Sequence, residues 1–208
     1  MQVFDNEDQF HKKLNKNINK IKPSKEQILS KAFQFHSQGN ISEAAKYYQY
    51  FINQGFKHHR VFLNYGIILK NLGKLQEAEI SFRKAVEIKA DFAEAYLNLA
   101  NISKNLGKLE EAEISLRKAI KIKPYYAKAL YNLGNILIDL GKLQEAEVSL
   151  RKAIDIKPDY VEAYYNLGNI LRILGKLEEA KLCSEKIISK RSWSILGSYS
   201  FNREMKLD

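Results

Sequence analysis

Apolar residues recur at helical spacing in two short segments of residues 127–158, and a polar break separates the segments. The first segment carries Leu130, Leu133, Leu137 and Leu140, and the second carries Leu143, Ala146, Leu150 and Ala153. Steps of three and four residues are typical of a helix with one apolar face. Gly141 and Lys142 stand at the break. The pattern predicts a hairpin of two helices, neither of which can bury its apolar face alone.

The same pattern returns every 34 residues along most of the chain. The glycine of the break recurs as Gly39, Gly73, Gly107, Gly141 and Gly175, and an alanine follows each time as Ala44, Ala78, Ala112, Ala146 and Ala180. Five units of equal length predict five hairpins stacked in chain order, each touching only its neighbours.

Small and bulky residues occupy fixed places in each unit, counted from residues 25, 59, 93, 127 and 161. The eighth position is always small and holds Ala32, Gly66, Ala100, Gly134 and Gly168. The fourth position is bulky and holds Ile28, Phe62, Tyr96, Leu130 and Tyr164. We expect the small residues to let the two helices of a hairpin approach closely, and the bulky ones to fill the space between hairpins.

Polar residues at the starts of the first helices predict how these helices are capped. Ser24 is followed three residues later by Gln27, Asp91 by Glu94, and Asp159 by Glu162. An acceptor at the N-cap with Glu or Gln three residues on is the capping-box pattern. We therefore predict capping boxes at these three places.

The period, the helix-turn-helix unit and the small residues at fixed offsets resemble the tetratricopeptide repeat (TPR) of the bacterial type. The resemblance covers residues 25–190 and implies an all-α fold, a right-handed α-solenoid of about five antiparallel helix hairpins. It places a TPR array at residues 23–190, with repeats starting near residues 25, 59, 93, 127 and 161. Residues 1–22 are polar, and we expect them to be disordered. Residues 191–208 are a capping segment or the stub of a further domain.

The chain has 208 residues and a net charge of +10, most of it from lysine. We interpret the charge mainly as solvated surface, although an acidic partner remains an alternative. Glu113 with Arg117 and Glu147 with Arg151 are spaced to form ion pairs along second helices. One cysteine, no signal-like N-terminus and no membrane-length apolar run favour a cytoplasmic protein that does not insert into membranes.

Asparagines follow the solvent face of successive first helices. The sixth position holds Asn64, Asn98, Asn132 and Asn166, and the ninth holds Asn101, Asn135 and Asn169. Lys70, Lys104 and Arg172 stand at position twelve, and Tyr131 and Tyr165 at position five. The TPR resemblance implies that first helices line a concave groove. Since an amide donates and accepts, we expect these residues to bind the backbone of an extended peptide. An alternative is that the amides only bond neighbouring first helices to each other.

A similar asparagine array occurs in the TPR arm of the O-linked N-acetylglucosamine transferases, where it holds peptide substrate. The resemblance covers the arm and not a catalytic domain. The sequence has no G-x-S-x-G, no phosphate loop and no cysteine close to a histidine. We therefore expect no catalytic residue, no cofactor and no metal site. His58 and His59 are adjacent at a helix start and are not expected to face each other.

These observations favour a non-catalytic scaffold that binds a peptide segment or a partner protein on its first-helix face. An alternative is the substrate-recognition arm of, or docking subunit for, a transferase-type enzyme. We do not expect a nucleic-acid partner, because the presumed groove is rich in amides and poor in arginine. Trp193, Leu196 and Tyr199 also leave open weak self-association of an otherwise monomeric chain through the C-terminal segment.

Overall fold

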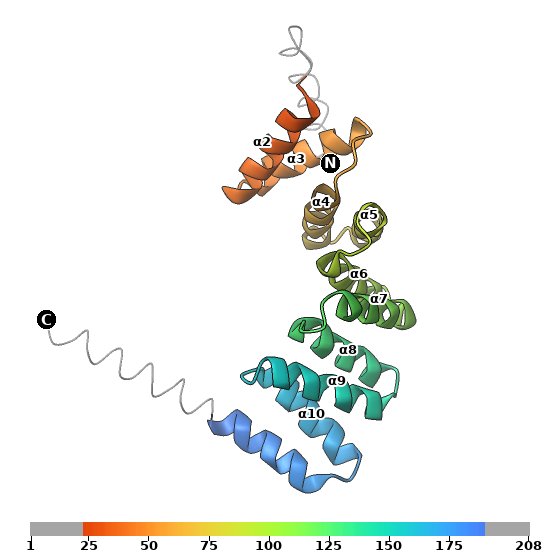
Figure 1. Cartoon of the computed structure of the whole chain (residues 1–208), viewed down its shortest axis with the longest axis vertical. Helices are drawn as coiled ribbons and strands as arrows, with labels where there is room; N and C mark the ends of the chain where they lie inside the picture. Colours follow the sequence, from red (N-terminus) through yellow and green to blue (C-terminus); the bar gives the residue numbers. More distant parts are fainter. Residues whose placement is uncertain (1–22, 190–208) are drawn as a thin grey trace, which may run out of the picture. The chain divides into compact units, whose positions relative to one another are not determined.

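The computed structural model describes residues 23–189, which are helical apart from short connections (Figure 1). The first helices of the five hairpins are α2 (Lys25–Ser37), α4 (His59–Asn71), α6 (Ala93–Asn105), α8 (Ala127–Asp139) and α10 (Val161–Ile173). The second helices are α3 (Ile41–Asn53), α5 (Leu75–Ile88), α7 (Leu109–Ile122), α9 (Leu143–Ile156) and the helical residues 177–189. The fold is all-α, as predicted. The expected disordered segment 1–22 and capping segment 191–208 lie outside the described residues.

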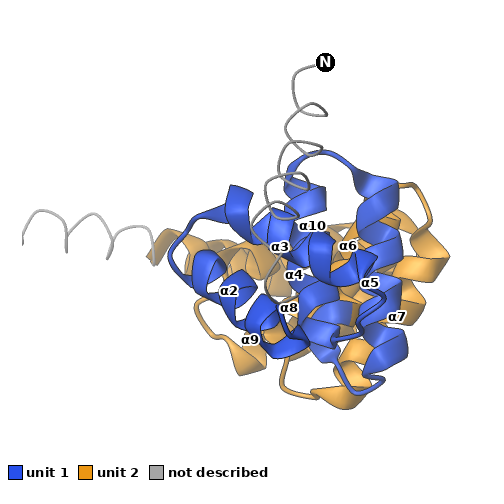
Figure 2. Ribbon diagram, turned by 90° about the horizontal axis from the view of Figure 1, so that it is seen from above, with its two compact units in different colours: residues 1–95 blue, residues 96–208 orange. Residues whose placement is uncertain are grey.

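The chain divides into two compact units, residues 1–95 and residues 96–208, with the boundary inside α6 (Figure 2). The core of the first unit joins α2, α3 and α4 around Ile28, Tyr48 and Phe51. The core of the second unit runs continuously from α6 to residues 177–189. Each core is thus shared by successive hairpins, as the apolar pattern predicts.

Each hairpin turns at a glycine in the left-handed conformation. Gly141 has φ +73°. Its N–H donates to the carbonyl of Ile138, and the N–H of Lys142 donates to the carbonyl of Leu137. These two bonds satisfy carbonyl groups at the end of α8, a Schellman arrangement that favours glycine at its centre. The repeating glycine therefore fixes where each first helix ends.

The capping prediction at Ser24 is confirmed, the one at Asp159 is wrong, and the one at Asp91 stays a prediction. The Ser24 hydroxyl accepts from the Gln27 N–H, and the Gln27 side chain accepts from the Ser24 N–H. By contrast α10 has Tyr160 as its N-cap, without a side-chain bond. Asp159 lies one residue too early, and Glu162 is only the second residue of the helix. The register is off by one, so the box cannot close.

The small residue at the eighth position sets the distance between the helices of a hairpin. A Cβ added at Gly134 would lie 2.7 Å from Cγ of Leu150, which is fully buried in α9. A Cβ added at Gly168 would meet nothing nearer than Cβ of Cys183, at 3.4 Å. The difference arises because Ser184 stands where Leu150 stands one repeat earlier.

We predict opposite effects on stability for the same substitution at these two glycines. Gly134→Ala should lower the free energy of unfolding by about 1 kcal/mol, because overpacking costs about 1–3 kcal/mol and exceeds the alanine gain in helix propensity. Gly168→Ala should raise it by up to about 1 kcal/mol. Urea unfolding followed by circular dichroism measures both. Equal effects would show that α8 and α9 are not held at close contact.

Candidate functional site

Ten of the twelve candidate site residues lie in the second unit, on α6, α8 and α10. They are Asn98, Asn101, Lys104, Tyr131, Asn132, Asn135, Tyr165, Asn166, Asn169 and Arg172. The other two, Asn64 and Lys70, lie on α4 in the first unit. The Asn64 amide donates to the hydroxyl of Tyr48 at 3.0 Å. It is therefore joined to α3 of its own unit.

Amide side chains bond neighbouring first helices of the second unit to each other. Nδ2 of Asn132 donates to Oδ1 of Asn101 at 2.8 Å, and Nδ2 of Asn166 donates to Oδ1 of Asn135 at 2.7 Å. All four side chains are half-buried rather than on a fully solvated face, because adjacent first helices approach closely enough to share them. Each pair uses one donor and one acceptor, so further N–H groups and lone pairs remain for another partner.

The exposed side of α10 differs from that of its neighbours. Tyr165, Asn169, Arg172 and Ile173 follow at steps of four, three and one, so they share one face of the helix. Tyr165 is 62% exposed and Ile173 is 69% exposed. Arg172 is exposed and forms no ion pair within residues 23–189. The face combines an exposed aromatic ring, an exposed cation and an exposed aliphatic side chain with the half-buried amide of Asn169.

The corresponding residues of α6 and α8 are largely engaged. Lys104 forms an ion pair with Asp139 at 2.8 Å. Tyr131 packs on Tyr160, with ring centroids 4.7 Å apart. Burial, then the neighbouring Tyr131 and Glu162, raise the pKa of Tyr160 to about 12. Tyr160 thus stays neutral and acts as packing.

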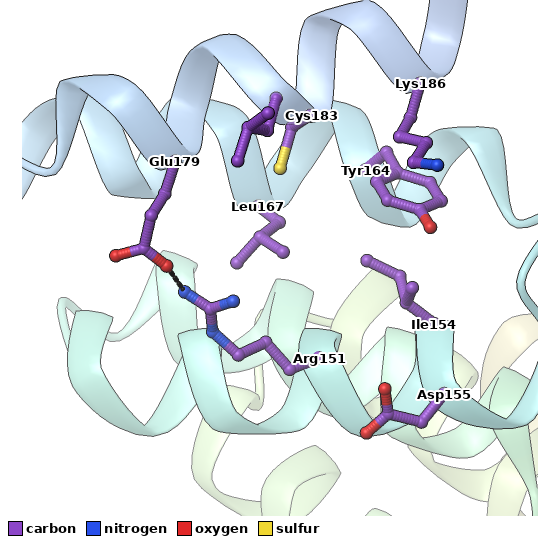
Figure 3. Close-up of a pocket in the computed structure, with 9 residues that line it drawn as sticks. Arg151, Ile154, Asp155, Tyr164, Leu167, Glu179, Cys183 and Lys186 are labelled. Carbon is purple, nitrogen blue, oxygen red and sulfur yellow. Dashed lines mark hydrogen bonds and ion pairs between the residues drawn. The ribbon is translucent and has the colours of Figure 1, made fainter.

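Two hollows of the second unit lie away from these residues, on the side of the second helices. The first hollow, about 420 Å³, is lined by Arg117, Ile120, Lys121, Leu130, Leu133, Glu145, Val148, Ser149 and Lys152. The second hollow, about 290 Å³, is lined by Arg151, Ile154, Asp155, Tyr164, Leu167, Glu179, Leu182, Cys183 and Lys186 (Figure 3). All nine positions of one hollow recur in the other, 34 residues later.

Sequence reasoning missed both hollows, although a signal for them exists. Position twenty-two of the unit is apolar in four successive repeats and remains 52–63% exposed, as Ile80, Ile114, Val148 and Leu182. Val148 and Leu182 stand at the edges of the two hollows. An exposed aliphatic residue that recurs on a second helix could have indicated a surface there.

Clusters of charge join consecutive second helices beside the hollows. Glu113 accepts from Arg117 of its own helix and from Lys142 of the next hairpin, each at 2.8 Å. Arg117 also pairs with Glu145. The same cluster returns 34 residues later as Glu147, Arg151, Lys176 and Glu179. The predicted pairs within α7 and α9 are confirmed, and each also reaches the next hairpin.

These clusters hold two carboxylates in their charged form. Hydrogen bonds from Lys142 and Arg117, opposed by burial, lower the pKa of Glu113. Lys176 and Arg151 lower the pKa of Glu147 in the same way. A carboxyl whose pKa is lower in the folded state stabilises the fold above its unfolded pKa. This contribution is lost as the pH falls through the folded pKa.

We therefore predict that the free energy of unfolding is nearly constant between about pH 5 and 7 and falls below about pH 4. The Glu113→Gln/Glu147→Gln variant should be less stable at pH 7 and should show a shallower acid slope. Urea unfolding at a series of pH values measures both. The matched control is Glu110→Gln/Glu178→Gln, because these exposed carboxylates form no ion pair within residues 23–189. An identical slope in both variants would contradict the prediction.

The two adjacent histidines differ from expectation in their geometry. The rings of His58 and His59 stack at 4.8 Å with 16° between their planes, so the prediction that they do not face each other is wrong. His58 is the extended N-cap of α4 and His59 is its first residue, which brings the rings together. Among residues 23–189, no group of three His, Cys, Asp or Glu residues is placed to hold a metal ion.

Family comparisons agree with this architecture. A model described as TPR repeat matches residues 134–175, and one described as tetratricopeptide repeat matches residues 115–148. A third, the middle TPR-like domain of cilia and flagella-associated protein 70, matches residues 28–129. The fold and the sequence matches thus both define the chain as a helical-repeat protein. The chain is a tetratricopeptide repeat protein.

Solved structures show the same fold. MamA superposes with a TM-score of 0.73 at 24% identity, covering 79% of this chain and 96% of MamA. YrrB, described as a TPR protein with an unusual peptide-binding site, gives 0.74 at 18% identity, covering 91% and 97%. The first TPR of Spaghetti (RPAP3), bound to the HSP90 peptide SRMEEVD, gives 0.55 at 25% identity, covering 56% and 93%.

No curated protein matches the chain significantly. The resemblance to the arm of the O-linked N-acetylglucosamine transferases stays a prediction. Within residues 23–189, no helix is both long and apolar enough to cross a membrane.

Proposed function

We propose that the chain is a protein-interaction scaffold that holds an extended peptide segment on the exposed side of α6, α8 and α10. The observation that carries the proposal is the pair of amide bonds between these helices. Asn101 with Asn132 and Asn135 with Asn166 present unused donors and acceptors at a regular interval. A peptide backbone also alternates donors and acceptors, so it is the ligand that such a series suits.

The amides supply affinity without much selectivity. Each hydrogen bond to a peptide contributes about 0.5–1.5 kcal/mol net, so four of them hold a segment only modestly. Selectivity requires side chains that contact those of the peptide. Tyr165 and Arg172 on α10 are exposed and suited to that role, since tyrosine and arginine are enriched among the residues that dominate binding.

The chemistry of the face favours a segment with an acidic residue near its α10 end. Lys104 is already neutralised by Asp139, whereas Arg172 has no carboxylate partner within residues 23–189. A bound acid could form a bidentate pair with the guanidinium group. The TPR of Spaghetti, with its acidic peptide SRMEEVD, supports such a ligand class for a related fold.

The test uses random twelve-residue peptides displayed on phage and selected on the full chain. We expect enriched peptides to bind the Tyr165→Ala/Arg172→Ala variant at least about tenfold more weakly, equivalent to about 1.4 kcal/mol. Fluorescence anisotropy of labelled peptides gives the dissociation constants. Since both side chains are exposed, circular dichroism should show unchanged helicity.

The matched control is Tyr125→Ala. Tyr125 is 80% exposed but lies in the connection between α7 and α8 and not on α10. Its removal should leave the dissociation constant unchanged. Peptides that bind the Tyr165→Ala/Arg172→Ala variant as well as the original chain would place the ligand elsewhere and overturn the proposal.

A further inference from the structure

The two hollows of the second unit have an apolar interior that reaches the surface. Leu130 and Leu133 of α8 line the first hollow and are each 4% exposed, whereas Val148 of α9 is 52% exposed at its edge. In the second hollow Leu167 is 3% exposed and Leu182 is 59% exposed. Figure 3 shows Ile154, Leu167 and the sulfur of Cys183 directed into the space between the helices. Each hollow therefore suits one aliphatic side chain.

The charges around the first hollow do not balance. Arg117 and Glu145 form an ion pair and neutralise each other. Lys121 and Lys152 remain, and neither forms an ion pair within residues 23–189. Two cations therefore line an apolar hollow, and neither has an ion-pair partner within residues 23–189.

The second hollow is lined by the residues at the nine equivalent positions, but its charges balance. Arg151 pairs with Glu179. Lys186 remains, but Asp155 stands where Lys121 stands one repeat earlier, so the remaining charges cancel. The protein thus contains two versions of one hollow that differ in charge at a single position.

We propose that the first hollow is a docking site for an acidic segment of a partner protein, which inserts a leucine-like side chain and places carboxylates beside Lys121 and Lys152. Charge complementarity selects this occupant, because a basic or neutral segment would leave both lysines uncompensated. The second hollow accepts the next aliphatic side chain without preference for charge. The site is formed by α7, α9 and the buried Leu130 and Leu133 of α8, and it does not use the exposed side of α6, α8 and α10.

The thiol of Cys183 can report whether the second hollow is occupied. Cys183 is the chain's one cysteine, lines the second hollow and is 7% exposed. Ser149 occupies the equivalent place in the first hollow and is also 7% exposed. The Ser149→Cys/Cys183→Ser variant therefore moves the reporter to the first hollow. Burial raises the pKa of the Cys183 thiol, so its modification by a neutral reagent is already slow and is best followed at mildly alkaline pH.

The probe is a twelve-residue peptide of alanine and glutamate with two leucines, and its control has lysine in place of each glutamate. With the reporter in the first hollow, the acidic peptide at saturation should slow modification by iodoacetamide at least about fivefold, by mass action. The basic peptide should not slow it. Adding Lys121→Asp should abolish most of the protection, since it reproduces the balanced charge of the second hollow.

The second hollow supplies a test in the opposite direction. In the otherwise unaltered chain, Asp155→Lys should make the acidic peptide protect Cys183 more strongly than before. Lys121 and Asp155 are both exposed, so circular dichroism should show that these variants fold as the parent does.

Three results would overturn the proposal. The first is no protection of the introduced thiol by the acidic peptide. The second is equal protection by the acidic and basic peptides, or protection unaffected by either charge reversal. The third is a slowing of thiol modification that occurs without peptide and increases with protein concentration. This result would identify a second copy of the chain as the occupant. None of these results bears on Tyr165 or Arg172, so failure here is distinct from failure of the proposed function.

Discussion

The structure depends on contact between consecutive hairpins, because no hairpin buries its own apolar face. This contact is polar as well as apolar. Glu113 lies between Arg117 of its own helix and Lys142 of the next hairpin, so one carboxylate is shared by two repeats. A buried or half-buried charge that loses its partner is costly, since its hydration was given up on folding. The clusters therefore penalise any arrangement in which neighbouring hairpins separate.

The sequence predicted most of the fold because the repeat makes each local signal appear five times. The turn glycine and the apolar spacing together locate the hairpins. Prediction failed where one residue of register decided the outcome, as at Asp159, which lies just before the N-cap of α10. It also failed for His58 and His59, because their stacking follows from the extended backbone at the start of α4.

The candidate site was only partly visible in the sequence. Helical spacing places Asn101 and Asn132 on equivalent faces, but it does not show that residues 31 positions apart would bond. Helical spacing does not decide whether these amides contact a ligand or bond neighbouring helices to each other. The structure shows the pairing, while each amide keeps atoms for a further partner. The hollows were harder to foresee, since each is formed by three helices from two repeats.

Because the repeats are equal in length and share their contact residues, the chain can change length by whole repeats. Removing residues 127–160 would place Lys176 and Glu179 where Lys142 and Glu145 now meet Glu113 and Arg117. The amide of Asn166 would likewise take the place of Asn132 beside Asn101. Gain or loss of a whole unit thus conserves the carboxylate clusters and the amide bonds between hairpins, whereas any other length breaks them. The ion pair of Lys104 with Asp139 is the exception, because Ile173 would take the place of Asp139. The interface itself makes 34 residues the step in which this chain can be lengthened or shortened by recombination.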